Sequence, residues 1–222
     1  MKHICIDFEG VGKSRNSEVS PFPTMLGALV PADRGRPKYH AWFFDEVFAP
    51  ICRSTSCVGR KEVIDIHTLA RQLVRLAEEK GCGLVHYSSH EARVFKDHLD
   101  RGTWREVRQK LLNIRPLAVK IRNRRGHTSE SNDLSSVMSR LRQGRSFPPQ
   151  PTRGAAQTCR DLLATGQRIS RWRNWPEARK VQAAQLLEYN KGDCDSVYRL
   201  VNIVHYHLGE DWVSSPRVQA IS

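Results

Sequence analysis

The chain has 222 residues, of which 39% are hydrophobic and 27% are charged. This length fits one α/β domain, and no run of about 18 apolar residues, such as a membrane span needs, is present. With 36 basic and 23 acidic residues the formal net charge is +13, which favours a polyanionic partner such as nucleic acid. We therefore expect a protein that does not cross a membrane.

The N-terminus and the cysteines indicate a reducing compartment. Asp7 breaks the first short apolar run, so we expect no secretory leader and a cytoplasmic location. The six cysteines are scattered without a Cys-x-x-Cys pair, which predicts reduced thiols. Cys52 and Cys57 are close enough for half of a zinc site, but no second pair of ligands answers them.

Three β-like runs open the chain. A buried strand that begins at residues 3–6 ends at a glycine turn after residues 7–10, and two runs rich in aromatic and branched residues follow at 24–30 and 39–48. An antiparallel meander of three strands is the economical interpretation. A fourth strand is predicted at 83–87.

Helical spacing of apolar residues begins at Asp65 and continues to Gly81, which predicts an amphipathic helix with a glycine stop. Two further helices are predicted at 91–99 and 104–112. The span 120–151 should form loops around one short helix at 134–141. The last helix should run from about 177 to 207, with Pro176 in its first turn.

The first motif with chemical meaning is Asp7-x-Glu9. Residues two apart in a strand project from the same face, so the two carboxylates converge. Crowded carboxylates repel each other unless a cation holds them. The alternative is a polar strand end that enters a turn.

The second motif is the string from His86 to Glu91, which follows a predicted strand and opens a helix. This position places Glu91 at the carboxyl edge of the sheet, where ligand sites of α/β proteins gather. The alternative is helix capping, because acids favour the first helical turn.

The third motif is Tyr189-x-x-x-Asp193 in the last helix. Asp193 lies on the apolar stripe of that helix, where an ionised carboxylate costs several kcal/mol unless something pairs with it. Tyr189 lies one turn earlier, so its hydroxyl can reach the same site. A buried salt bridge to an arginine is the alternative, and Asp195 is the less suitable neighbour.

These motifs, in this order, resemble those of the DEDD exonucleases of the tyrosine subclass, on a ribonuclease H-like fold. Within that superfamily the chain is most similar to the predicted RecB-associated ribonuclease H-like nucleases, because Tyr189-Asn190-Lys191-Gly192-Asp193-Cys194 matches their Tyr-Asn-x-x-Asp-Cys string. Two departures are that Glu91 stands where the superfamily usually has Asp, and that the basic middle of the chain is unmatched.

The resemblance implies an α/β fold with a mixed sheet of about five strands, the first three antiparallel, flanked by helices. It implies one domain over 1–222, with a basic insertion at about 101–175. Asp7, Glu9, Glu91 and Asp193 would hold two Mg²⁺ or Mn²⁺ ions about 4 Å apart, which activate water and stabilise the leaving oxygen. Tyr189 would orient the attacking water.

The implied activity is hydrolysis of DNA or RNA, with a 3′–5′ exonuclease acting on a single strand or a 3′ end favoured. The alternatives are an endonuclease or junction resolvase of the same fold, and a non-catalytic nucleic-acid-binding module. Basic side chains would follow the phosphates, and tryptophans would stack on unpaired bases unless they are core residues. The candidates for these contacts are Arg122, Arg124, Arg125, Arg171, Trp172 and Arg173.

Overall fold

The computed structural model describes residues 3–12, 19–141, 151, 153–214 and 218. Its centre is a six-stranded sheet in the order β4-β3-β2-β1-β5-β6. The strands are β1 (Ile4–Gly10), β2 (Pro23–Val30), β3 (Lys38–Phe43), β4 (Arg60–Val63), β5 (Leu84–His86) and β6 (Leu111–Asn113). Strand β2 is antiparallel to β1 and β3, whereas every other neighbouring pair is parallel. The predicted mixed sheet with an antiparallel start is therefore confirmed, with six strands in place of about five.

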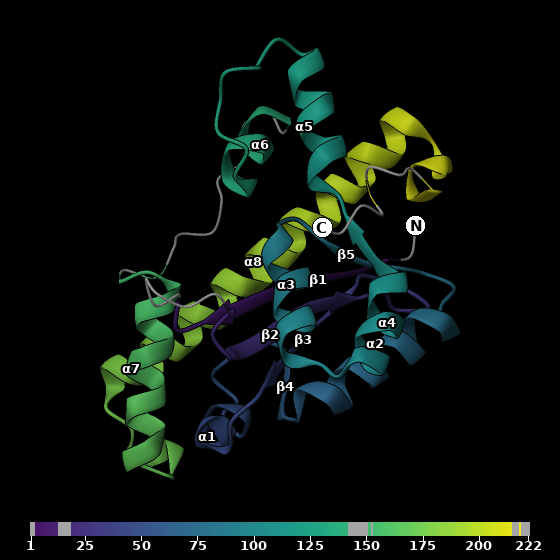
Figure 1. Cartoon of the computed structure of the whole chain (residues 1–222). Coiled ribbons are helices and arrows are strands. Elements are labelled where there is room, and N and C mark those ends of the chain that lie inside the picture. The colour runs from purple at the N-terminus through teal and green to yellow at the C-terminus, as the bar shows by residue number, and fades with distance from the viewer. Residues whose placement is uncertain (1–2, 13–18, 142–150, 152, 215–217, 219–222) are drawn as a thin grey trace.

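Helices cover both faces of the sheet (Figure 1). The helices are α1 (Ala49–Cys52), α2 (Ile66–Glu79), α3 (Ser89–His98), α4 (Arg101–Lys110), α5 (Arg115–Arg124), α6 (Leu134–Leu141), α7 (Ala155–Arg168) and α8 (Glu177–Leu208). Short 3-10 turns add η1 (Glu46–Phe48), η2 (Trp172–Asn174) and η3 (Glu210–Ser214). In the described part of the chain, no helix has the length and apolar character that crossing a bilayer requires.

Alternation along β1 separates the two cores. Ile4, Ile6 and Phe8 pack against the face that α2, α3 and α4 cover, whereas Cys5 points toward α8. Asp7 and Glu9 share the Cys5 face by the same period of two. Helices α5 and α6 project beyond the sheet, and α7 lies beside the N-terminal half of α8 (Figure 1).

Most predicted elements are confirmed, with shifted ends. Helix α2 begins after Asp65, which caps it by accepting from the Thr68 N–H, and α6 spans the predicted residues 134–141. Helix α8 ends at Leu208, one residue beyond the predicted end, and Pro176 is its N-cap and not part of its first turn. All six cysteines are free thiols.

Three predictions about secondary structure were wrong. Leu111 and Leu112 form β6 beside β5 instead of ending a helix, because they fill both faces of the sheet edge. Residues 120–124 end helix α5 instead of forming a loop, since Leu117, Ala118 and Ile121 are buried at helical spacing. The run 39–48 is a strand only to Phe43. Strand β4 and helix α7 were not predicted, and residues 142–150 of the expected loop region lie outside the described residues.

One glycine allows α8 to lie close to the sheet. Gly27 pairs with Asp7 across β1 and β2. A Cβ atom at Gly27 would lie 1.5 Å from Asn190 Oδ1 and 2.9 Å from the Tyr39 hydroxyl. The absence of a side chain at this position therefore lets an amide of α8 reach β1.

We predict that Gly27→Ala lowers the free energy of unfolding by about 1–3 kcal/mol, the usual result of overpacking. Denaturant unfolding measures the change. Gly10→Ala is the matched control in a neighbouring strand, because its Cβ would meet its nearest atom at an ordinary 3.7 Å. A wild-type midpoint for Gly27→Ala would mean that α8 does not approach β2 this closely.

Candidate metal centre

Three carboxylates from distant parts of the sequence meet between strand β1 and helix α8. Asp7 and Glu9 come from β1 and Asp193 comes from α8. One oxygen from each lies within 4.8 Å of the others. The period-two spacing on β1 and the approach of α8 together produce this cluster.

Asn190 ties the helix to the strand beside the acids. Its buried amide nitrogen donates to Asp7 Oδ2 at 2.8 Å and to the Asp7 carbonyl oxygen at 3.1 Å. Its Oδ1 accepts from the Tyr39 hydroxyl at 2.8 Å. Asn190 precedes Asp193 by three residues, so both lie on the same side of α8. The amide thus fixes the orientation of the Asp7 carboxylate.

Glu91, on helix α3, lines the same cavity as Asp7 and Asp193. It lies in the first turn of α3, which follows β5, and only 3% of it is exposed. The Ser88 hydroxyl donates to its Oε2 at 2.8 Å, and His86 Nδ1 lies 3.5 Å from the same oxygen. Burial opposes ionisation of Glu91, but the hydrogen bond and charge of His86 hold its pKa below the ordinary value. Glu91 is therefore the acid of the site that ionises most easily.

The three clustered acids are shifted in the opposite direction. Burial raises the pKa of Glu9 to about 8 and that of Asp193 to about 6, and the neighbouring carboxylates add to both shifts. Burial, then the charges of Glu9 and Asp193, raise the pKa of Asp7 well above its usual range. Without a cation, the cluster holds protons to a higher pH than free carboxylates do, Glu9 to about pH 8 and Asp193 to about pH 6. A bound divalent cation would favour the ionised forms, so the donor set fits a hard metal ion.

Tyr189 lies one turn before Asp193 on α8 and is half-buried. Burial and the Asp193 charge raise the pKa of its hydroxyl. The hydroxyl keeps its proton and hydrogen bonds to the Asp193 carboxylate, where it opposes the upward shift of the Asp193 pKa. Tyr189 is consequently a hydrogen-bond donor to Asp193.

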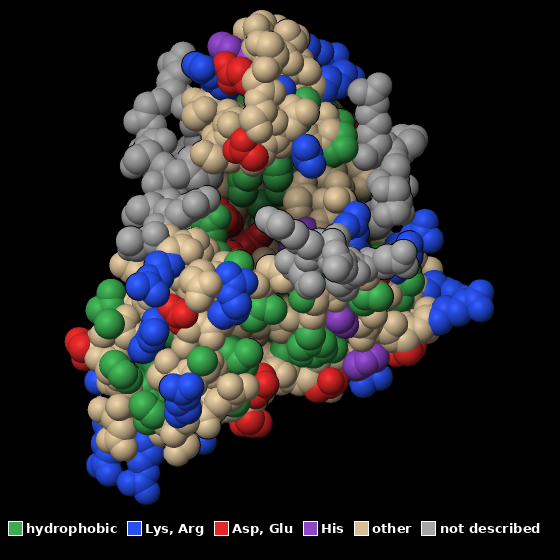
Figure 2. Space-filling view, turned by 60° about the vertical axis from the view of Figure 1, so that its left-hand side comes forward, with side chains coloured by type: hydrophobic (Ala, Val, Ile, Leu, Met, Phe, Trp, Pro, Cys, Tyr) green, Lys and Arg blue, Asp and Glu red, His purple; other side chains and the backbone are tan. Residues whose placement is uncertain are grey.

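The acids open into a cavity of about 430 Å³. Figure 2 shows acidic side chains deep in a hollow of this face, with Lys and Arg side chains on the surface around it. The lining residues are Asp7, Tyr87, Ser88, Glu91, Arg115, Ser131, Asn132, Asp133, Leu134 and Asp193. Three of the four predicted acids therefore face one solvent-accessible space.

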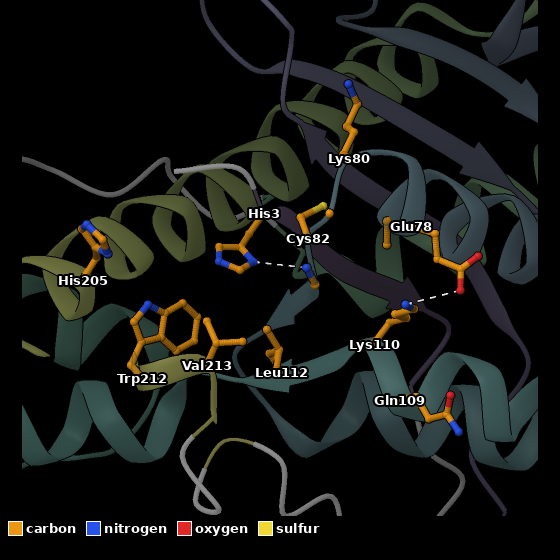
Figure 3. Close-up of a pocket in the computed structure, with 13 residues that line it drawn as sticks. His3, Glu78, Lys80, Cys82, Gln109, Lys110, Leu112, His205, Trp212 and Val213 are labelled. Atoms are coloured by element: carbon orange, nitrogen blue, oxygen red, sulfur yellow. Dashed lines mark hydrogen bonds and ion pairs between the residues drawn. The ribbon is translucent and has the colours of Figure 1, made fainter. Parts of the chain in front are cut away.

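A second cavity, of about 630 Å³, lies at the other end of β1, where His3 precedes the strand (Figure 3). Its polar side chains include Cys82, His205 and the ion pair of Lys110 with Glu78, which measures 3.3 Å. Among the described residues that line it, Glu78 is the only carboxylate, and it pairs with Lys110. This cavity lacks the grouped acids of the first.

The predicted nucleic-acid contacts divide into two groups. Arg124, Arg125, Arg171 and Arg173 are exposed, and Trp172 is half-buried against Trp175 at a ring distance of 5.3 Å. The prediction for Arg122 was wrong, because only 1% of it is exposed and its guanidinium donates to oxygen atoms of the loop that follows α5. Trp175 is a core residue whose indole N–H donates to the Ile169 carbonyl oxygen.

Asn190, His86 and Tyr39 support the site but were not among the predicted site residues. Asn190 gave a signal, since a polar residue on an apolar helical stripe needs a buried partner. His86 stood inside the second motif without an assigned contact. Tyr39 gave no signal, because its hydroxyl meets Asn190 across 151 residues of sequence.

Comparison with known proteins finds no protein family, no curated relative and no solved structure that this chain matches. The evidence for function is therefore the geometry and chemistry of the site.

We predict that the metal-free protein loses stability as the pH rises from 6 to 8. The folded state holds protons on the acid cluster that the unfolded chain has released, so the unfolded state binds fewer protons and the free energy of unfolding falls with pH. Relative to Glu9→Gln, the wild type should lose about 1–2 kcal/mol over this interval. Denaturant unfolding at each pH measures the slope.

Addition of Mn²⁺ at pH 8 should reverse this loss in the wild type, because the cation binds the ionised carboxylates. Asp195→Asn is the matched control, since Asp195 lies on the same helix but pairs with Arg199 at 2.5 Å. It should retain the wild-type slope and the response to Mn²⁺. Equal slopes for the wild type and Glu9→Gln would contradict the raised pKa of the cluster.

Proposed function

We propose that the chain is a divalent-metal-dependent nuclease that hydrolyses phosphodiester bonds of nucleic acid. The observation that carries the proposal is the cluster of Asp7, Glu9 and Asp193 within 4.8 Å, with Glu91 beside it in the same cavity. A protein that only binds nucleic acid has no need of carboxylates that repel phosphate. Their burial in a chain of net charge +13 is reasonable if cations and phosphate occupy the cavity together.

The donor set consists of carboxylate oxygens, which suit Mg²⁺ or Mn²⁺. Asp7, Glu9 and Asp193 would hold the metal, and Glu91 would complete the site from α3. Bound there, two ions would activate water and stabilise charge on the departing oxygen. The uneven pKa values of the four acids are consistent with a site completed by cations.

The surrounding residues would then orient the reacting groups. Asn190 holds the Asp7 carboxylate, and Ser88 and His86 hold that of Glu91. The Tyr189 hydroxyl remains protonated, so it would accept from or donate to the attacking water and not remove its proton. Rigid carboxylates and a fixed donor are what positioning a water against a phosphate requires.

The fold supports a narrower form of the proposal. The acids lie on the first strand, after a later strand and on the last helix, and the mixed sheet is compatible with a ribonuclease H-like arrangement. Together with the motif resemblance, this favours a DEDD-type exonuclease that acts from a free 3′ end.

End-labelled single- and double-stranded DNA and RNA, incubated with Mg²⁺ or Mn²⁺, test the proposal. We expect mononucleotides released from the 3′ end and no reaction in excess chelator. A circular single strand that is cut as readily as a linear one would favour an endonuclease. Activity that persists in chelator would exclude the metal mechanism.

Single changes to the acids should abolish turnover without unfolding the protein. Asp193→Asn and Glu9→Gln each remove a buried carboxylate whose ionisation the fold opposes, so stability should not fall. The rate should drop by about 100-fold or more. Loss of a residue that only hydrogen-bonds to a metal ligand already costs about 10- to 100-fold, and loss of the ligand itself should cost at least as much. Asp195→Asn is the control with wild-type rate. A near-normal rate at saturating metal would show that the altered acid is not a ligand.

Tyr189→Phe isolates the hydroxyl, because the ring keeps its packing. If the hydroxyl orients water, the rate of the chemical step should fall by about 10²–10⁴-fold, as for other groups that act in proton transfer. Single-turnover rates at saturating Mn²⁺ measure this step. Tyr198→Phe, on the same helix, is the matched control. An unchanged rate would make Tyr189 a packing residue.

A further inference from the structure

The segment from α5 to the start of α6 forms one wall of the acid cavity. Arg115, Ser131, Asn132, Asp133 and Leu134 line the cavity together with the acids of the site. The Asp133 carboxylate is engaged at the start of α6, where it accepts from the Ser136 N–H and hydroxyl. Figure 1 shows that α5 and α6 project beyond the sheet. None of the three sequence motifs includes a residue of this wall. Its polar atoms face the space into which the carboxylates open.

A buried arginine organises this wall. Arg122 donates from Nη1 to the Ser131 carbonyl oxygen at 2.6 Å and from Nη2 to Asn132 Oδ1 at 2.8 Å. It also donates to Asn123 Oδ1 at 2.8 Å, and no described carboxylate forms an ion pair with it. A guanidinium buried among neutral acceptors is costly, and here its donors are used to hold a loop in one conformation.

Asn132 is exposed, yet it is anchored from two sides. Its Oδ1 accepts from Arg122, and its backbone carbonyl oxygen accepts from the Tyr87 hydroxyl at 2.8 Å. With Oδ1 engaged, the side-chain amide presents its NH₂ group as the remaining donor. Within the described residues nothing accepts from that group, so a fixed donor is available at the cavity.

Arg115 supplies a positive charge to the same cavity. It is the first residue of α5, is half-buried, and is the only Lys or Arg among the described residues that line the cavity. The described residues include no ion-pair partner for its guanidinium. An arginine is charged at every working pH and has a planar set of donors that matches phosphate.

We propose that Arg115 and the Asn132 amide bind a phosphate of the nucleic-acid strand that enters this cavity, and that Arg122 is the positioning residue for Asn132. A cavity of about 430 Å³ is within the usual size of a small-molecule site, so it suits one nucleotide of a single strand. The inference rests on the proposed function, because it assigns the substrate side of the same site. The acids would hold metal, and this wall would hold the strand.

Binding of a fluorescent single-stranded oligodeoxythymidine, measured by anisotropy in Mn²⁺ on the Asp193→Asn background, tests the assignment of Arg115. Arg115→Ala should weaken binding by about 10- to 100-fold, as expected for a lost charged hydrogen bond. Arg124→Ala removes the same charge from the same helix, but Arg124 does not line the cavity, and it should change affinity by less than about threefold.

Asn132→Asp separates binding from structure. An aspartate keeps the acceptor for Arg122, so the loop should stay ordered, but it replaces the free donor with a negative oxygen. We expect a loss of affinity of about tenfold or more, with an unchanged denaturation midpoint. If the only role of Asn132 were to hold the loop, Asn132→Asp would bind the oligonucleotide as tightly as its parent.

Arg122→Lys loses the paired donors that hold Asn132. It should therefore weaken oligonucleotide binding, and so should Asn132→Ala, which removes the amide itself.

The outcomes for this wall and for the nuclease proposal are distinct. Arg115→Ala that binds like Arg124→Ala, or a parent protein that binds no oligonucleotide, overturns the inference. If Arg115→Ala cleaves nucleic acid in a metal-dependent reaction with normal KM, the proposed phosphate contact is refuted and the nuclease proposal is unaffected. Absence of cleavage together with a selective loss of binding in Arg115→Ala would refute the nuclease proposal and support the phosphate contact.

Discussion

The crowding of Asp7, Glu9 and Asp193 is the interaction on which the arrangement of this protein depends. Carboxylates this close repel one another and lose hydration, which is why their pKa values rise. The fold nevertheless holds them together, because Asn190 binds β1 to α8 and Gly27 leaves room for that amide. Apolar cores on both faces of the sheet offset the unfavourable electrostatics.

The fourth acid shows that position alone does not determine the charge state of a carboxylate. Glu91 is more buried than the other three acids, but Ser88 and His86 stabilise its ionised form. The site therefore combines one carboxylate that ionises readily with three that resist ionisation. A cation bound by such an asymmetric set would stabilise the whole fold, since the cation would relieve the repulsion.

Two arginines close in sequence serve different purposes around the same cavity. Arg122 is buried and orders the loop after α5, whereas Arg115 contributes its charge to the cavity itself. The basic segment is thus not a uniform electrostatic surface. Part of its charge is structural, and the exposed remainder is distributed over other surfaces, as at Arg124 and Arg125.

Local sequence patterns predicted much of the secondary structure and part of the candidate site. Apolar residues at helical spacing predicted α2, and alternation predicted that Asp7 and Glu9 share a face of β1. The partial burial of Asp193 followed from its place on the apolar stripe of α8. These inferences succeed because each depends on residues within a few turns or positions of one another.

Only the tertiary structure decided which of these groups meet. The Asn190 amide reaches Asp7 across 183 residues, and no local pattern contains that distance. A basic run looks the same whether its members are exposed or buried, so the burial of Arg122 depended on the packing of α5 against the loop at residues 130–132. Likewise, Leu111 and Leu112 became a strand because β5 offered an open edge. Side-chain chemistry is encoded locally, whereas the partners of each side chain are set by contacts between distant segments.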